Sequence, residues 1–263
     1  MTARPYAPPP EATPHRRLCL AADMEQYSRL ETRAQSVMQA DLVRALDEAA
    51  MLAGLDRAAW ARQPQGDQEL AILPEGTPEA SILGPFVRHL TAQLAALNAH
   101  RPATIRMRLR LAVDIGIVED AALGHAGPAP VAVARYLSAP QLKTALATAH
   151  SANLAVIISD QLYQDVVRLG NHDLDPSQYV RTHVRVKEFG NYGWMHLPGH
   201  SPDDEWSSVS IPAEPQSPPG EPDPGPVLLS QHVREGVTVG RDVIGDVTVG
   251  LPSHTPPADR CPR

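Results

Sequence analysis

The stretch that decides the fold runs from Leu18 to Ser28 and reads Leu-Cys-Leu-Ala-Ala-Asp-Met-Glu-Gln-Tyr-Ser. Its apolar half, 18–22, predicts a buried strand that ends at Asp23, and a helical pattern begins shortly afterwards. Free backbone N–H groups at such a helix start suit phosphate, and a carboxylate at the strand end suits a divalent metal. An aspartate that only caps a helix produces the same pattern, so this stretch alone leaves both interpretations open.

A second acidic residue follows a predicted amphipathic helix over residues 30–53. The apolar members of that helix are Val37, Leu42, Leu46, Ala49, Ala50 and Leu52. Gly66-Asp67 then comes before a strand at 70–73, which predicts a hairpin tip. A hairpin after a long helix can bring Asp67 beside Asp23, and two convergent carboxylates commonly hold Mg²⁺ against a triphosphate. Turn chemistry alone also explains Gly-Asp.

The rest of the chain predicts alternating helices and strands. We expect a helix at 78–98, a half-buried strand at 105–118, a glycine-rich turn at 124–127, helices at 131–137 and 141–150, a buried strand at 154–158, a helix at 160–169, and a strand pair at 180–186 and 192–197 across Gly190-Asn191. The order is β-α-β-β-α-β-α-α-β-α-β-β. It predicts one α/β sandwich with a mostly antiparallel sheet, because short turns join the closing strand pairs.

Composition sets the borders of this domain. The 27 prolines cluster at the two ends of the 263-residue chain. We expect a disordered arm at 1–14, the folded domain at 15–200, a proline-rich linker at 201–227 and a mostly flexible tail at 228–263. The tail repeats Val-Thr-Val-Gly after ten residues, which indicates either a self-pairing hairpin or an element that binds a protein partner.

Charge and apolar patterning narrow the classes of partner. The net charge of −7 argues against non-specific nucleic-acid binding, which needs a basic surface. No apolar run approaches the length of a membrane span, and the N-terminus lacks the apolar core of a signal peptide, so we expect a cytoplasmic protein. Neither a dinucleotide-binding nor a P-loop glycine motif is present, and the 11 histidines show no zinc-ligand spacing.

A third feature lies at Gly127-Pro-Ala-Pro-Val131-Ala-Val-Ala-Arg135, where a glycine turn opens a helix. Arg135 projects about two turns into this helix, where it can neutralise charge on phosphate oxygens. A surface arginine on a helix is an equally good account of this residue alone.

In their order, the three features resemble the catalytic domain of class III adenylate/guanylate (nucleotidyl) cyclases. That family has an Asp-hydrophobic-x-x-aromatic-Ser/Thr segment, a Gly-Asp hairpin, a strand ending in a His-x-Gly turn, and a helix with Gly-x-x-x-Asn-x-x-x-Arg. The resemblance covers residues 17–150, and more loosely extends to 200. It implies a ferredoxin-like α/β sandwich and a head-to-tail homodimer with composite sites. Segments around 134–140 and 184–199 also resemble a group of actinobacterial cyclase-homology proteins.

The resemblance assigns a role to five residues. Asp23 and Asp67 match the two aspartates that bind Mg²⁺ or Mn²⁺ in a two-metal site. Tyr27-Ser28 match the aromatic-hydroxyl pair beside the phosphates, and Arg135 matches the arginine that stabilises the transition state.

Four other positions depart from the family pattern. Gln63 stands where the family has a base-reading lysine or glutamate, and Gly124 falls loosely on the second base-reading position. Val131 replaces the helix asparagine, and Asp114 replaces the histidine of the His-x-Gly turn. Gln63 remains a candidate for binding the base, because its amide can hydrogen-bond to several bases.

These matches and departures leave three functions open. The first is metal-dependent conversion of a nucleoside triphosphate to a cyclic nucleotide. The second is a catalytically inactive module that binds nucleotide and signals to a partner. The third is a dimerising scaffold in which Asp23 and Asp67 only cap and turn the backbone.

Overall fold

The computed structural model describes residues 13–170 and 173–210. The arm up to residue 12, most of the predicted linker and the Val-Thr-Val-Gly repeats lie outside the described residues. The predictions for those segments therefore stay predictions.

One eight-stranded sheet organises the described chain. Its strands are β1 (His15–Met24), β2 (Ala61–Gln65), β3 (Gln68–Ile72), β4 (Leu109–Ala121), β5 (Gly124–Ala126), β6 (Leu154–Ser159), β7 (Val180–Val186) and β8 (Phe189–His196). They are ordered β2-β3-β1-β4-β6-β8-β7, with β5 paired to β4. All the pairings are antiparallel except the one between β4 and β6. The predicted α/β sandwich with a mostly antiparallel sheet is confirmed.

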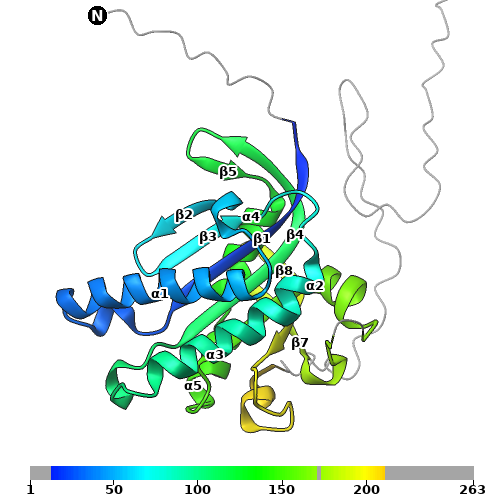
Figure 1. The fold of residues 1–263 in the computed structure, drawn as a ribbon. Coiled ribbons are helices and arrows are strands. Elements are labelled where there is room, and N and C mark those ends of the chain that lie inside the picture. Colours follow the sequence, from blue (N-terminus) through cyan, green and yellow to red (C-terminus); the bar gives the residue numbers. More distant parts are fainter. Residues whose placement is uncertain (1–12, 171–172, 211–263) are drawn as a thin grey trace, which may run out of the picture. The chain divides into compact units, whose positions relative to one another are not determined.

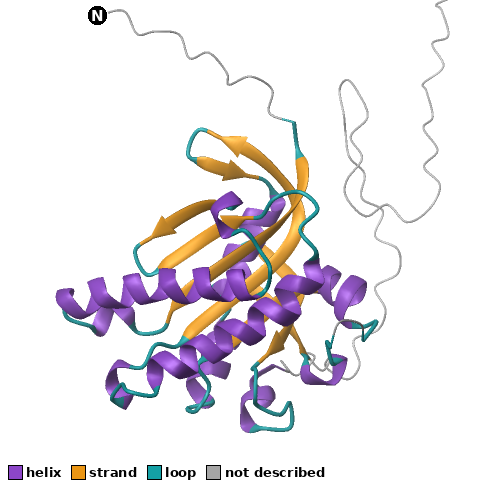
Figure 2. Ribbon diagram, viewed as in Figure 1, coloured by secondary structure: helices purple, strands orange, loops and turns teal. Residues whose placement is uncertain are grey.

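Helices cover both faces of the sheet (Figures 1 and 2). Their bounds are α1 (Thr32–Leu52), α2 (Glu79–Ser81), α3 (Val87–Asn98), α4 (Pro128–Leu137), α5 (Pro140–Thr148) and α6 (Asp160–Leu162). Two π-helical segments, η3 (Ile82–Phe86) and η5 (Tyr163–Val167), continue α2 and α6. The shorter 3₁₀ segments are η1 (Tyr27–Arg29), η2 (Arg57–Ala59), η4 (Ala103–Ile105), η6 (Pro176–Gln178) and η7 (Glu205–Ser210).

Alternation along β1 explains the two cores. Leu18, Leu20, Ala22 and Met24 pack into the core shared with α1 and α3, whereas Cys19 and Ala21 pack into the core shared with α4 and α5. Since successive strand residues point to opposite faces, this register sends the side chain of Asp23 to the α4/α5 face.

Several predicted elements differ in detail. Val37 and Leu52 were expected on the buried face of the first long helix, yet they are 52% and 50% exposed, because Met38 and Ala45 complete that face instead. The helix predicted at 78–98 is interrupted by a π-turn at Pro85, whose nitrogen cannot donate an α-helical hydrogen bond.

Two turns also differ from the prediction. The 124–127 segment contains the short strand β5 rather than only a turn. The last hairpin turns at Lys187-Glu188 and not at Gly190-Asn191, since Val186 pairs with Phe189 and Lys187 has a φ of 56°. The turn is thus made by a lysine in the left-handed conformation, and not by the glycine that the sequence indicated.

Residues 201–210, placed in the predicted linker, carry the 3₁₀ segment η7. Its Trp206 is 1% exposed and belongs to the core on the α4/α5 face. Across the residues that the structure describes, no helix combines the length and apolar character of a membrane span.

Candidate functional site

Asp23 lies at the end of β1, next to residues of two neighbouring strands. The backbone register places it opposite Gln68 of β3 and Arg110 of β4. Its side chain is 13% exposed, so the carboxylate has little contact with water.

Asp67 reaches the same end of the sheet through the predicted hairpin. β2 and β3 are joined by Gly66-Asp67, and Gly66 has a φ of 68°, a conformation that favours glycine. The Met24 N–H donates to the backbone carbonyl of Asp67 at 3.1 Å, which ties the turn to the residue after Asp23. The structure therefore brings the two predicted aspartates together.

Tyr27 and Ser28 follow Asp23 in the 3₁₀ segment η1, before α1 begins at Thr32. The Gln39 side-chain amide on α1 donates to the Tyr27 hydroxyl at 2.8 Å and to the Gly66 carbonyl at 3.0 Å. Gln39 thus connects η1 to the turn that carries Asp67. Sequence reasoning missed this residue, because an exposed glutamine on a helix gives no signal of its own.

The charge state of Asp23 depends on its burial and on the charges around it. Burial raises the pKa of its carboxyl, an ion pair with Arg110 opposes that rise, and the negative charge of Asp67 adds to it. The effect of Asp67 on the pKa of Asp23 agrees with the backbone contact that ties the Asp67 turn to Met24. Arg110, which is 13% exposed, is a second residue of the site that no motif indicated.

The carboxylate oxygens of Asp23 and Asp67 are suitable ligands for a hard divalent cation that a bound nucleotide also helps to coordinate. In the described ranges, no group of three or more His, Cys, Asp or Glu side chains gathers at one place. Asp23 and Asp67 would therefore be the two protein carboxylates of the site. Mg²⁺ is commonly held by one or two carboxylates with phosphates and water filling the remaining positions, so this pair fits Mg²⁺ or Mn²⁺ bound with a triphosphate.

Arg135 belongs to a different cluster. It lies on α4, and its guanidinium pairs with Glu188 at the β7–β8 turn at 2.9 Å. Val131, one turn earlier, is 49% exposed and offers no polar group. No described contact joins Arg135 to Asp23 or Asp67, so the contacts within one chain do not unite all the predicted residues.

Gln63 and Gly124, the two loosely matched base-reading positions, lie in contact. The Gln63 amide donates to the Leu123 carbonyl at 3.3 Å. A Cβ on Gly124 would come within 1.2 Å of the Gln63 Nε2 atom, and Gly124 has a φ of 117°. The hairpin of β4 and β5 therefore holds Gln63, and the positive φ favours glycine at position 124.

Asp114 is 8% exposed and faces a cavity of about 660 Å³ with Ser159 and Asp160. Burial raises the pKa of its carboxyl, and a hydrogen bond from Ser159 opposes this. Val113 and Ile158 form the last parallel pair of β4 and β6, and Asp114 and Ser159 are the next residue of each strand.

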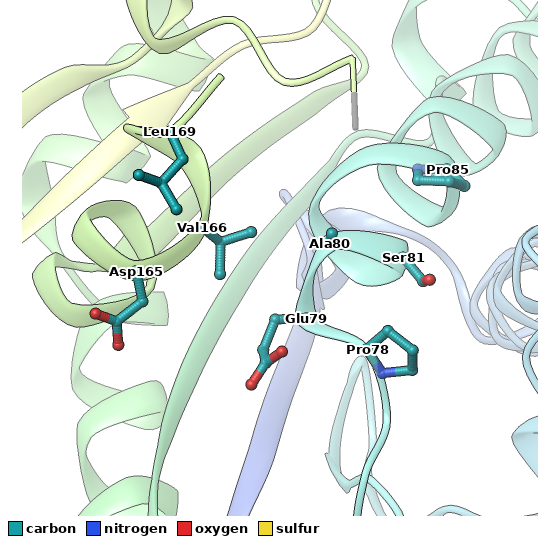
Figure 3. A pocket seen from close by; sticks show the side chains of 8 residues that line it. All are labelled: Pro78, Glu79, Ala80, Ser81, Pro85, Asp165, Val166 and Leu169. Carbon is teal, nitrogen blue, oxygen red and sulfur yellow. The ribbon is translucent and has the colours of Figure 1, made fainter. Parts of the chain in front are cut away.

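Another hollow lies between the two π-helical segments (Figure 3). It is lined by Pro78, Glu79, Ala80, Ser81, Pro85, Asp165, Val166 and Leu169. None of the predicted site residues lines it, so it plays no part in the site built around Asp23.

Comparisons with known proteins bear on the fold. No family model and no curated protein matches the chain. An adenylate/guanylate cyclase/hydrolase from Silicibacter pomeroyi is 20% identical, with a TM-score of 0.53 over 72% of this chain and 100% of that one. A bacterial light-regulated adenylyl cyclase is 11% identical, with a TM-score of 0.52 over 76% of this chain and 57% of that one.

At this level of identity, the likeness concerns the fold alone. The similarity to the actinobacterial group stays a prediction. The fold expected from the family resemblance is confirmed: this chain has the fold of an adenylate/guanylate cyclase domain.

Proposed function

We propose that the chain is a divergent nucleotidyl cyclase that converts a nucleoside triphosphate to a 3′,5′-cyclic nucleotide and pyrophosphate with Mg²⁺ or Mn²⁺. The observation that carries this proposal is the meeting of Asp23 and Asp67 at one end of the sheet, beside the start of α1. Neither a helix cap nor a turn needs a second carboxylate nearby, whereas a metal site of this kind does.

The balanced reaction assigns each group a place. The 3′-hydroxyl oxygen bonds to the α-phosphorus, the bond to the bridging oxygen breaks, and pyrophosphate leaves with its electron pair while the hydroxyl proton passes to solvent. Metal held by Asp23 and Asp67 would supply charge neutralisation and a lowered hydroxyl pKa. The backbone N–H groups at Tyr27-Ser28 would bind phosphate oxygens.

Arg135 acts from the other half of a composite site. Since its described contact within the chain is with Glu188, it reaches the α-phosphoryl group only if a second copy presents α4 to Asp23. A head-to-tail homodimer accounts for this separation, and Arg135 then stabilises charge on the transferring phosphoryl. Gln63, whose amide is held at the Leu123 carbonyl, would contact the base.

A catalytically inactive nucleotide-binding module is the second candidate. It is favoured by Val131, which is half exposed on α4 and provides no hydrogen-bond donor for the transition state. Loss of one such donor typically slows an enzyme by about 100–1,000-fold, so a slow enzyme is still compatible with Val131.

The test incubates the full chain with each of the four nucleoside triphosphates and Mg²⁺ or Mn²⁺, with cyclic product detected by mass spectrometry. Asp67→Ala is the loss-of-function variant, and Asp165→Ala, at an exposed carboxylate of the hollow in Figure 3, is the matched control. Product that disappears in Asp67→Ala and persists in Asp165→Ala supports the cyclase and names its base.

Binding distinguishes the remaining outcomes. If no triphosphate gives product but Mn²⁺ and triphosphate bind in an Asp67-dependent way, the inactive nucleotide-binding module is correct. If neither binds, Asp23 and Asp67 have only structural roles, and the chain is a scaffold.

A further inference from the structure

Asp114 is a buried carboxylate without a neighbouring cation. The residue is 8% exposed, and no described arginine, lysine or histidine lies within ion-pair distance of its carboxylate. Burial raises the pKa of this carboxyl, while hydrogen bonds from Ser159 and the Ile115 backbone and the more distant charge of Arg16 oppose the rise. A carboxylate without a cationic partner is costly to bury, so its place on the wall of a cavity calls for an explanation.

The cavity next to Asp114 is large enough for a small organic molecule. Its volume is about 660 Å³, and small-molecule sites commonly measure about 300–1,000 Å³. It lies where the parallel pairing of β4 with β6 stops, and α4 supplies another part of its wall. Asp114 stands where the family resemblance implies a histidine, so this chain has an acidic group where a basic one is expected.

Much of the remaining cavity wall is apolar or aromatic. β8 contributes Phe189, and α4 contributes Pro128, Ala129, Val131 and Ala132. The Phe189 ring packs edge-on against the ring of Tyr136, with the ring centroids 5.2 Å apart. The Tyr136 hydroxyl donates to the Tyr192 carbonyl at 2.7 Å, so its donor is already used within the chain. A carbon skeleton can bury its surface against this wall, and aromatic rings attract organic cations.

A second carboxylate adds negative charge to the cavity. Asp160 lines it as well, and its Oδ1 atom accepts a hydrogen bond from the Trp194 indole at 2.8 Å. The Nε atom of Arg181 lies 3.9 Å from the same oxygen, but the two side chains are 51% and 36% exposed, so this pair is weak. The charge of the cavity therefore favours a cationic ligand.

An organic cation fits this cavity better than a metal ion does. Across residues 13–170 and 173–210, no group of three or more His, Cys, Asp or Glu side chains could hold a metal ion. Hard cations prefer a shell of about six or more oxygen ligands, which the apolar part of the wall does not supply. An ammonium group, in contrast, needs a carboxylate for its charge and an apolar surface for its carbon skeleton, and the cavity offers both.

We propose that this cavity binds a small organic ammonium ion, whose charged group pairs with Asp114 and whose carbon skeleton packs against α4 and Phe189. The bound positive charge stabilises the ionised carboxylate, which the chain alone leaves unpaired. The inference goes beyond the proposed function and does not rest on it, because neither the metal nor the nucleotide takes part in it.

The experiment titrates the full chain with phenethylammonium and, separately, with phenethyl alcohol at constant ionic strength, and follows the amide signals by NMR. The two probes have nearly the same shape, but only the first carries a charge. We expect phenethylammonium to bind with a dissociation constant of about 1 mM or tighter. It should shift the amide signals of Gly116 and Asn191, which line the cavity. Phenethyl alcohol should bind at least about tenfold more weakly, because it lacks the charge that pairs with Asp114.

Three variants test the residues involved. Asp114→Asn keeps the shape of the side chain but removes its charge, so it should bind phenethylammonium at least about tenfold more weakly and phenethyl alcohol as the wild-type chain does. Ala132→Leu keeps the charge but fills part of the cavity, so both probes should bind more weakly. Asp165→Asn changes an exposed carboxylate of the hollow in Figure 3 and is the matched control, with neither affinity altered.

The comparison of the two probes separates a charge-selective site from a merely apolar hollow. Phenethylammonium binding that is unchanged in Asp114→Asn overturns the inference, and so does equal binding of the charged and the uncharged probe. Absence of phenethylammonium binding to the wild-type chain at about 10 mM overturns it as well. The last two results need no variant, so the inference can be refuted even if a substitution prevents folding.

Discussion

Replacing Glu69 should lower the free energy of unfolding and also weaken the proposed metal site. Glu69 lies on β3, two residues after Asp67, and its carboxylate pairs with Arg57 at 2.6 Å. The two side chains are only 7% and 4% exposed. Arg57 also pairs with the carboxylate of Asp47, which is 52% exposed. The Arg57–Glu69 pair therefore joins η2 to the strand that positions Asp67.

The magnitude follows from burial. Glu69→Ala leaves the Arg57 guanidinium buried with only the exposed Asp47 as a charged partner, and breaking a buried pair from one side costs about 3–5 kcal/mol. Because Asp47 still offsets part of the charge, we expect a loss of about 3 kcal/mol. For a folded region of about 200 residues, this corresponds to a fall in Tm of roughly 6–12 °C.

The assay is urea unfolding followed by circular dichroism, with Glu75→Ala as the matched control. Glu75 pairs with Arg17 at 3.0 Å just beyond β3, but its side chain is 76% exposed. An exposed pair contributes about 0–1 kcal/mol, so this variant should be nearly as stable as the wild-type chain. A loss below about 1 kcal/mol for Glu69→Ala would refute the argument from burial. Mn²⁺ affinity, measured in parallel, should fall for Glu69→Ala only.

Four further predictions concern other sites. Burial raises the pKa of the Asp114 carboxyl, so ionising this group costs more free energy in the folded state than in the unfolded chain. Asp114→Asn should therefore raise the free energy of unfolding at pH 7, by roughly 1.4 kcal/mol for each unit by which the pKa is raised. When unfolding is measured against pH, this gain should vanish below the ordinary carboxyl pKa. Gly124→Ala should lower Tm and speed amide exchange in the β4–β5 hairpin, because a φ of 117° strains alanine and the new methyl group displaces the Gln63 amide. Burial, with a smaller effect of Asp114, raises the pKa of the Cys19 thiol to about 12, so a thiol reagent should label Cys19 only after denaturation. Trp206→Ala should cost about 3–5 kcal/mol in urea unfolding, as expected for a fully buried indole, and a wild-type-like midpoint would show that η7 does not stabilise the domain.

Much of the fold could be predicted because strong local sequence patterns indicate its main elements. The apolar run before Asp23, the long amphipathic helix and the Gly-Asp turn each have one dominant periodicity or turn signal. Details failed where tertiary context decides. Val37 satisfies the helical spacing but lies on the exposed side of α1. Lys187 makes a tight turn with a positive φ, which a lysine in the sequence does not indicate.

Only those residues of the candidate site that belong to recognisable sequence motifs could be predicted. The two aspartates follow recognisable strand-end and hairpin signals, and the structure places them together. Arg110 and Gln39 could not be found in this way, since their roles depend on cross-strand register and on a helix passing over a turn.

The departures from the cyclase pattern differ in the role they affect. Both aspartates of the predicted metal site are kept, whereas Gln63 and Val131 stand where the family resemblance implies a base-reading residue and a transition-state asparagine. Recognition of metal and phosphate is therefore separable from base selection and transition-state support in this chain. If the proposed dimer forms, Val131→Asn should raise turnover without changing the affinity for Mn²⁺–triphosphate, because the restored donor acts on the transition state. An unchanged rate with an active enzyme would mean that α4 does not face the α-phosphoryl group, and the head-to-tail arrangement would then be wrong.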